Sequence, residues 1–173
     1  MKSENQHYQL DDSIIYTSNS PTETKRLGKK LGSLLQGGDF VAFNGELGAG
    51  KTCFIQGIVF GLGCKEQVLS PSFSLIKEYK GMNPIYHFDL YRLTKPEELE
   101  ELGYEEYFSG NGITLVEWAK KIEEYLPKDF LSVKITMNEN NYFTRKILIK
   151  SIGAANRYRK IIEELRHLGH FGN

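Results

Sequence analysis

The stretch NGELGAGKTCF, residues 44–54, decides which fold this chain is expected to have. It follows the spacing G-x-x-x-x-G-K-[ST], with Gly45, Gly50, Lys51 and Thr52 at the defining positions. In such a loop the glycines allow backbone N–H groups to approach and cradle phosphate oxygens. The spacing indicates phosphate binding only where a strand enters the loop and a helix leaves it.

Both neighbours are predicted from the flanking sequence. Residues 39–45, DFVAFNG, are a short apolar run that ends in turn residues, which is typical of a buried strand. Residues 51–62, KTCFIQGIVFGL, are apolar on most of a helical surface, which predicts a helix packed against a sheet. The loop would then lie at a helix N-terminus, where the helix dipole and the free N–H groups favour an anion.

This context predicts a nucleotide site. The loop backbone surrounds the phosphates, Lys51 reaches the β- and γ-phosphates, and the Thr52 hydroxyl binds Mg²⁺. The residues of the loop expected to bind the nucleotide are Gly45, Glu46, Leu47, Gly48, Ala49, Gly50, Lys51 and Thr52.

The remaining sequence alternates between helical and strand patterns. Ser20, Pro21 and Glu23 are typical of a capped helix start, and leucines then recur at helical spacing up to the QGG of residues 36–38. Further strands are expected at residues 73–80, 85–91, 112–118, 130–137 and 142–150, and further helices at residues 95–103, 119–127 and 154–171.

Strands that alternate with helices predict an α/β fold, here a single P-loop NTPase-type domain. Two pairs of strands joined by short turns indicate hairpins, so the sheet flanked by these helices is expected to mix parallel and antiparallel strands. We expect residues 1–152 to form the P-loop ATPase domain and residues 153–173 a C-terminal helical tail.

The composition fits one domain with an ordinary core. Of 173 residues, 40% are hydrophobic, and 22 basic residues balance 22 acidic ones, so no overall field attracts nucleic acid or membranes. No apolar run approaches the roughly 20 residues that a membrane helix needs, and residues 1–12 lack the apolar stretch of a signal peptide. Cys53 and Cys64 are too few for a disulfide framework and lack a zinc spacing. We therefore expect a cytoplasmic protein.

Two carboxylates stand at the ends of apolar runs, Asp89 in IYHFDLYRL and Glu117 in ITLVEWAKK. At the carboxyl end of a strand in an α/β sheet, a side chain faces the crevice where ligands bind. Each carboxylate can hold the metal directly, hold it through water, or orient an attacking water. With Lys51 they are the candidate catalytic residues, and with Thr52 the candidate metal ligands.

Four other side chains lie near these positions in the sequence. Ser70 and Ser72 in SPSF belong either to a nucleotide-sensing switch or to a proline turn that enters a strand. His87 can share a strand face with Asp89, but a structural role is the better reading. Trp118 follows Glu117 and either covers the nucleotide or a partner, or fills the core.

The sequence favours ATP as the nucleotide. A guanine-reading NKxD and a DxxG are both absent after the loop. A small-molecule kinase of the P-loop class is the main alternative, but it usually needs a mobile lid with arginines, and no such segment is visible. A non-catalytic nucleotide-binding adaptor is the third reading. The favoured one is an ATPase that binds ATP, docks on a partner, hydrolyses and releases.

Several stretches together resemble the TsaE (YjeE) family, small bacterial ATPases required to make threonylcarbamoyladenosine in tRNA. The matching stretches run from about Gly45 to Pro127, in the family's order and at its spacings, and the start of the first helix is also similar. They are GELGAGKT, SPSFSLIKEY, YHFDLYRL, PEELEELGYEEYF and LVEWAKKIEEYLP.

The resemblance implies a compact P-loop domain in which Lys51 and Thr52 hold phosphate and Mg²⁺, while Asp89 and Glu117 serve the metal and hydrolysis. It also implies that Trp118 lies beside the active site and that Thr17 contacts the nucleotide. The partners it implies are the TsaB and TsaD proteins, with low ATPase activity alone and hydrolysis that resets the TsaB–TsaD pair. Contact with tRNA is then indirect, through the complex, which agrees with the neutral net charge.

Two departures from the family pattern matter. Ser72 stands where threonine is usual in SPTF, and because a hydroxyl is kept we expect its role to survive. The tail after about Ile152 has no counterpart in the resemblance. Its basic run of Arg157, Arg159 and Lys160 is either a solvated helix face or a contact for RNA or a partner.

Overall fold

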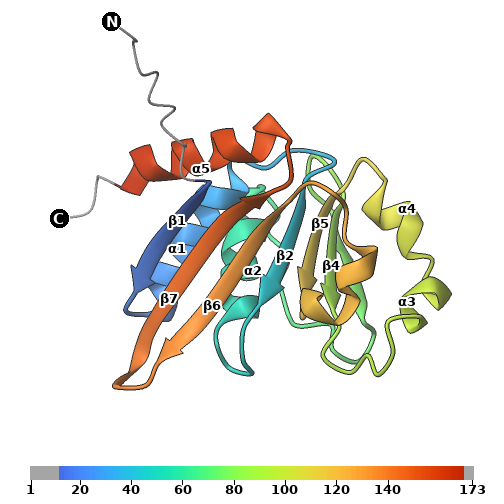
Figure 1. Ribbon diagram of the computed structural model, residues 1–173, viewed down its shortest axis with the longest axis horizontal. Coiled ribbons are helices and arrows are strands. Elements are labelled where there is room, and N and C mark those ends of the chain that lie inside the picture. The colour runs from blue at the N-terminus through green and yellow to red at the C-terminus, as the bar shows by residue number, and fades with distance from the viewer. Residues whose placement is uncertain (1–11, 170–173) are drawn as a thin grey trace, which may run out of the picture.

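The computed structural model describes residues 12–169. Its centre is a seven-stranded sheet in the order β1-β7-β6-β2-β5-β4-β3 (Figure 1). The strands are β1 (Ser13–Ser18), β2 (Phe40–Asn44), β3 (Ile76–Tyr79), β4 (Ile85–Asp89), β5 (Ile113–Glu117), β6 (Phe130–Asn138) and β7 (Asn141–Ile152). The helices are α1 (Pro21–Gly32), α2 (Lys51–Gly61), α3 (Glu98–Glu101), α4 (Tyr104–Phe108), the 3₁₀ helix η1 (Ala119–Tyr125) and α5 (Asn156–Gly169).

The predicted mixed sheet is confirmed. Strand β2, which leads into the phosphate loop, lies in the middle and pairs in parallel with both β5 and β6. Strand β4 pairs in parallel with β5, whereas β3, β7 and β1 add antiparallel ribbons toward the two edges. The ends of β2, β4 and β5 therefore meet at one edge of the sheet, where α/β proteins bind ligands.

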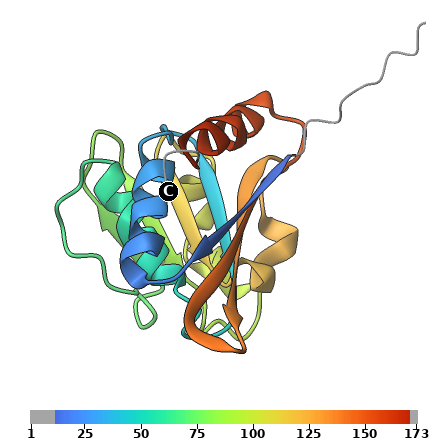
Figure 2. The ribbon, with the colours of Figure 1, turned by 90° about the vertical axis from the view of Figure 1, so that its left-hand side faces the viewer.

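The core has two parts because side chains alternate along each strand. From β2, Val41 and Phe43 join the cluster that is covered by α1, α2 and α5. Phe40 and Ala42 join the cluster on the opposite face, covered by α3, α4 and η1. Figure 2 shows α1 and α2 together on one side of the sheet and η1 on the other.

Helix α1 begins as its sequence predicts but ends early. The Ser20 side chain accepts a hydrogen bond from the backbone N–H of Glu23 at 3.2 Å. The expected helix continued to the QGG of residues 36–38, whereas α1 ends at Gly32. The backbone then tightens into i→i+3 bonds, and the Asp39 carboxylate accepts from the backbone N–H of Gln36 at 2.8 Å. The helix stops because this turn provides other partners for its backbone.

Other boundaries also differ from the prediction. Residues 13–18 are not among the expected strands, but they form the edge strand β1, paired with β7. Helix α4 was not predicted. Residues 119–125 form a 3₁₀ helix instead of an α-helix, and Ile122 within it has non-helical backbone angles. Ile122 is fully buried, so core packing sets the conformation of this segment.

The C-terminal segment packs on the same core as the sheet. Tyr158, Ile161, Ile162 and Leu165 of α5 are buried with side chains from β1, β6 and β7. The expected helix extended to residue 171, and residues 170 and 171 lie outside the described residues, as does most of the polar N-terminal stretch. No helix within residues 12–169 is long and apolar enough to span a membrane.

Candidate functional site

The phosphate loop connects the end of β2 to the start of α2. Gly48 and Gly50 have φ angles of 78° and 107°, a region that side-chain-bearing residues rarely adopt. Helix α2 then begins at Lys51, and Gly50 occupies its N-cap position. The motif therefore has the strand-loop-helix context that phosphate binding requires.

Lys51 is held against the loop. Its Nζ donates to the carbonyl oxygens of Gly45 and Glu46 at 2.7 and 2.8 Å. Nζ also lies 3.9 Å from the ring centroid of Trp118. Burial lowers the pKa of the Lys51 amine, and the nearby carboxylates of Glu117 and Asp89 partly oppose this shift. A bound triphosphate would likewise favour the charged amine.

The two predicted carboxylates lie together at the edge of the sheet. Asp89 and Glu117 are register partners at the ends of the parallel strands β4 and β5, and both are buried. The Thr52 hydroxyl donates to Glu117 Oε1 at 2.8 Å, which connects the loop to β5. The Ser70 hydroxyl donates to Asp89 Oδ2, which connects the predicted switch segment to β4.

His87 contacts Glu117 directly. Its Nε2 lies 2.9 Å from Glu117 Oε1, and the imidazole is fully buried. Its Nδ1 has no hydrogen-bond partner among the described residues. The sequence placed His87 on the same strand face as Asp89 but could not show that the neighbouring strand brings Glu117 to it. His87 and Thr52 therefore both restrain the Glu117 carboxylate at the same oxygen, Oε1.

These residues surround one cavity of about 400 Å³. The predicted residues that line it are Leu47, Gly48, Gly50, Lys51, Thr52, Ser70, Ser72, Asp89, Glu117 and Trp118. Trp118 has a positive φ of 62°, and its ring lies 5.1 Å from that of Tyr91. Unusual backbone angles in a non-glycine residue are often found at functional sites. Trp118 thus lines the cavity on one side and packs against the second core cluster on the other.

The remaining predicted residues are placed differently. The carbonyl oxygens of Gly45 and Glu46 accept hydrogen bonds from Lys51, and the Ala49 side chain is buried in the first core cluster. Thr17 is exposed on β1, paired with Lys146, and is not among the residues that line the cavity. Its nucleotide contact stays a prediction.

Two arginines at the site were not singled out by the sequence. Arg145 of β7 donates from Nε to the carbonyl oxygen of Ala49 at 3.0 Å, and this hydrogen bond stabilises the phosphate loop. Arg92 is among the residues that line the cavity, and its guanidinium carbon lies 4.1 Å from the ring centroid of Phe73. Neither arginine was predicted to lie at the site, because each contact depends on which strands and loops become neighbours.

The donor set suits a cation that arrives with a nucleotide. No group of three or more His, Cys, Asp or Glu side chains within residues 12–169 could hold a metal by itself. The threonine hydroxyl and two carboxylates are the hard oxygen donors that Mg²⁺ prefers, and Mg²⁺ usually takes its remaining ligands from phosphates and water. The site therefore fits Mg²⁺ bound to ATP better than a metal held by protein alone.

Comparison with known proteins shows the family to which the chain belongs. The family model described as "Threonylcarbamoyl adenosine biosynthesis protein TsaE" matches residues 18–147. The chain belongs to the TsaE family. TsaE proteins take part in tRNA threonylcarbamoyladenosine biosynthesis, and the matched residues include the loop, both carboxylates and the serine segment.

Individual TsaE relatives cover most of the chain. The "tRNA threonylcarbamoyladenosine biosynthesis protein TsaE" of Bacillus subtilis (strain 168) is 44% identical over 150 residues, which are 86% of this chain and 91% of the relative. The TsaE of Rickettsia conorii is 43% identical over 129 residues, 73% of each chain. The crystal structure of Bacillus subtilis YdiB superposes with a TM-score of 0.78 at 38% identity, covering 91% of this chain and 96% of that one.

Proposed function

We propose that this chain is the Mg²⁺-dependent, ATP-binding and ATP-hydrolysing subunit of the bacterial tRNA N6-threonylcarbamoyladenosine modification complex. The observation that carries the proposal is the convergence of Thr52, Glu117 and Asp89 on one cavity beside the phosphate loop. The assignment to tRNA threonylcarbamoyladenosine biosynthesis rests on membership in the TsaE family.

The residues of the chain divide the work of hydrolysis. The N–H groups of the loop and the Lys51 ammonium bind the β- and γ-phosphates, and Thr52 with the two carboxylates would hold the Mg²⁺. When bound, Mg²⁺ neutralises charge on the phosphate oxygens. A carboxylate of Asp89 or Glu117 orients the water whose oxygen attacks the γ-phosphorus as the bond to ADP breaks.

The surroundings of the site support a docking switch. Leu47 belongs to the phosphate loop, and Leu69 and Phe73 flank Ser70 and Ser72; their exposed fractions are 68%, 63% and 85%. Exposed apolar side chains at one place often mark a surface for a protein partner. The Ser70–Asp89 hydrogen bond ties this segment to the site, so a change at the γ-phosphate can move it. We assign this surface to docking on the TsaB–TsaD pair. ATP hydrolysis would then reset the pair between turnovers. The proposed site of action is the cytoplasm.

Phosphate release from Mg²⁺–ATP tests the proposal. We expect slow release by the chain alone and faster release when TsaB and TsaD are added. Full-rate turnover without them would contradict the docking switch. Stoichiometric transfer of phosphate to a metabolite, with no free phosphate, would instead support a small-molecule kinase of the P-loop class. ATP binding without hydrolysis, with or without the partners, would support a non-catalytic adaptor.

A further inference from the structure

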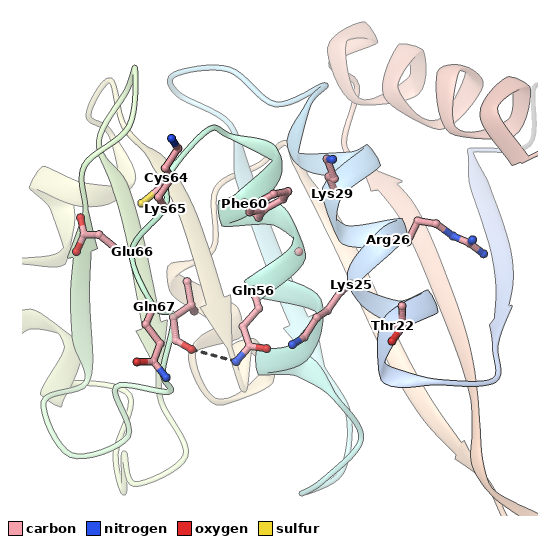
Figure 3. A pocket seen from close by; sticks show the side chains of 12 residues that line it. Thr22, Lys25, Arg26, Lys29, Gln56, Phe60, Cys64, Lys65, Glu66 and Gln67 are labelled. Carbon is pink, nitrogen blue, oxygen red and sulfur yellow. Dashed lines mark hydrogen bonds between the residues drawn. The ribbon is translucent and has the colours of Figure 1, made fainter.

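A second cavity, of about 590 Å³, lies over the outer side of α1 and α2 (Figure 3). It shares no lining residue with the candidate nucleotide site. Its walls come from the two helices and from residues 64–68, which follow α2. We call this cavity the α1–α2 groove, and its principal side chains are Lys25, Lys29, Gln56, Phe60 and Lys65.

The groove carries a concentrated positive charge. Lys25, Arg26, Lys29 and Lys65 line it, and none of them has an ion-pair partner among residues 12–169. The acidic side chain at its rim, Glu66, accepts a hydrogen bond from the backbone N–H of Lys80 at 3.1 Å. Figure 3 shows Glu66 turned away from the helices, whereas Lys25 extends toward Gln56. The three lysines therefore line the groove, and no carboxylate among residues 12–169 forms an ion pair with them.

The groove also exposes an aromatic surface. Phe60 has an exposed fraction of 58%, although the rest of α2 is largely buried. Lys29 Nζ lies 4.9 Å from the Phe60 ring centroid. Positive charge that tracks a backbone, combined with an aromatic ring on which a base can stack, is the usual design of single-strand nucleic-acid binding sites.

Many exposed acidic residues, and the arginines that form ion pairs, lie outside the groove. Exposed glutamates concentrate on the opposite face of the sheet, on α3, α4 and η1 and just before α3; they are Glu97, Glu100, Glu101, Glu105, Glu106, Glu123 and Glu124. In the C-terminal helix, Arg157 and Arg159 pair with Asp39 and Asp12 at 2.7 and 3.3 Å. A neutral total charge therefore does not exclude a polyanion at this groove, because the basic side chains that line it have no ion-pair partner among the described residues.

We propose that the α1–α2 groove binds a single-stranded stretch of tRNA directly, with phosphates on Lys25, Lys29 and Lys65 and a base on Phe60. The choice of tRNA rests on the proposed function, which places the chain in tRNA modification, but it does not require ATP hydrolysis. The TsaE chain would then hold the RNA itself as well as act on its protein partners. An acidic protein segment is the competing occupant, and the experiment separates the two.

The test measures binding of a fluorescently labelled, unmodified tRNA transcript to the full chain by anisotropy across a salt series. In one variant Lys25, Lys29 and Lys65 are all replaced by alanine. In the matched control Lys134, Lys146 and Lys150, exposed on β6 and β7, are replaced by alanine, so the net charge is the same. We expect the groove variant to lose about tenfold or more in affinity, and its slope of log K against log salt to be shallower by about 2. The control should change little.

A Phe60→Ala variant separates stacking from charge. We expect it to weaken binding by about fivefold or more at an unchanged salt slope, because it removes a stacking surface and no charge. Equal losses in the groove variant and the control, or no tRNA binding by the unaltered chain at low salt, would overturn the proposal. Displacement of the tRNA by poly-glutamate at equal charge concentration would overturn it in favour of an acidic protein segment.

Phosphate release by the same variants keeps this inference separate from the proposed function. Lys25, Lys29 and Lys65 lie outside the nucleotide site, so the groove variant should hydrolyse ATP as the unaltered chain does. If the chain binds tRNA through the groove but releases no phosphate, the ATPase proposal fails and the groove assignment stands. If the chain hydrolyses ATP but the groove variant binds tRNA as tightly as the unaltered chain, the groove assignment fails and the ATPase proposal stands.

Discussion

Glu117 is the residue on which the site depends most, because it is held from two sides. Thr52 donates to its Oε1 and His87 lies within hydrogen-bond distance of the same oxygen. A carboxylate fixed in this way at a strand end can orient a water or a metal without rearranging.

Replacing Glu117 by glutamine tests this role. The amide keeps the shape of the side chain but cannot act as a base or carry charge, so we expect phosphate release to fall about 100-fold or more. ATP binding, followed with a fluorescent analogue, should change by less than about threefold, because Lys51 and the loop provide most of the phosphate contacts. Glu123→Gln, on the exposed face of η1, is the control. An unaltered rate in the Glu117 variant would remove this residue from the mechanism.

His87 is predicted to act by positioning Glu117. His87→Phe removes the hydrogen bond to Oε1, and we expect kcat to fall about tenfold while the affinity for ATP stays the same. His87→Gln can place an amide near the former Nε2 position, so it should recover part of the activity. Equal loss in both variants, or a change in ATP affinity alone, would indicate a purely structural role for the buried imidazole.

The residues that sequence analysis could place share one property. Lys51 and Thr52 belong to a contiguous motif, and Asp89 and Glu117 each end an apolar run, so local patterns were enough. The contact between His87 and Glu117 joins two strands, and Arg145 reaches the loop from a third. Such contacts depend on strand order, which no local pattern contains.

At the scale of elements, α1 and α2 pack unusually closely because glycines line their interface. Gly28 and Gly32 of α1 face α2, and Gly57 and Gly61 of α2 face α1, each pair separated by four positions. A Cβ at Gly57 would lie only 2.2 Å from the Lys25 carbonyl oxygen. This close approach places the backbone of Lys25 and Lys29 directly against α2, so the two helices together form one wall of the α1–α2 groove.

Gly57→Ala should therefore destabilise the fold. In a free helix alanine would be favoured over glycine by about 1 kcal/mol, but here the methyl group meets backbone that cannot move away easily. We expect the free energy of unfolding to fall by about 2 kcal/mol or more, measured by urea denaturation. Thr22→Ala, at an exposed position of α1, should shift it by less than about 0.5 kcal/mol. A stabilised Gly57 variant would show that the helices can separate at little cost.

Most elements were predictable and most boundaries were not. The strand-loop-helix unit and the two antiparallel pairs follow from apolar runs and turn residues. The early end of α1, the strand β1 and the 3₁₀ form of η1 are set by partners distant in the sequence, among them Asp39, β7 and the core around Ile122. Tertiary contacts decide such details over local propensity.

At the scale of the whole molecule, α5 closes one end of the core. The Tyr158 hydroxyl accepts a hydrogen bond from the backbone N–H of Phe40 at 3.0 Å, at the start of β2, the strand that leads into the phosphate loop. Arg157 adds hydrogen bonds to the Leu34 carbonyl oxygen and the Asp39 carboxylate at 2.6 and 2.7 Å. The C-terminal helix is therefore connected to the central strand and to the turn after α1.

A chain that ends at Ile152 should be much less stable than the full chain. It loses the burial of Tyr158, Ile161, Ile162 and Leu165, each worth roughly 1.5–3 kcal/mol before the entropy of ordering the helix is subtracted. We expect the free energy of unfolding to fall by at least about 3 kcal/mol in a urea titration. An unchanged midpoint would mean that residues 153–173 are a separate appendage.

The central claim is that the ends of β4 and β5 meet a cation held at the Lys51–Thr52 turn. A crystal structure of the chain with a non-hydrolysable ATP analogue and Mn²⁺, with the metal located by its anomalous signal, tests it most directly. We predict a metal about 2 Å from Thr52 Oγ1 and a phosphate oxygen, with Asp89 and Glu117 bound to it directly or through one water. A triphosphate or metal that lies away from both carboxylates would contradict the account.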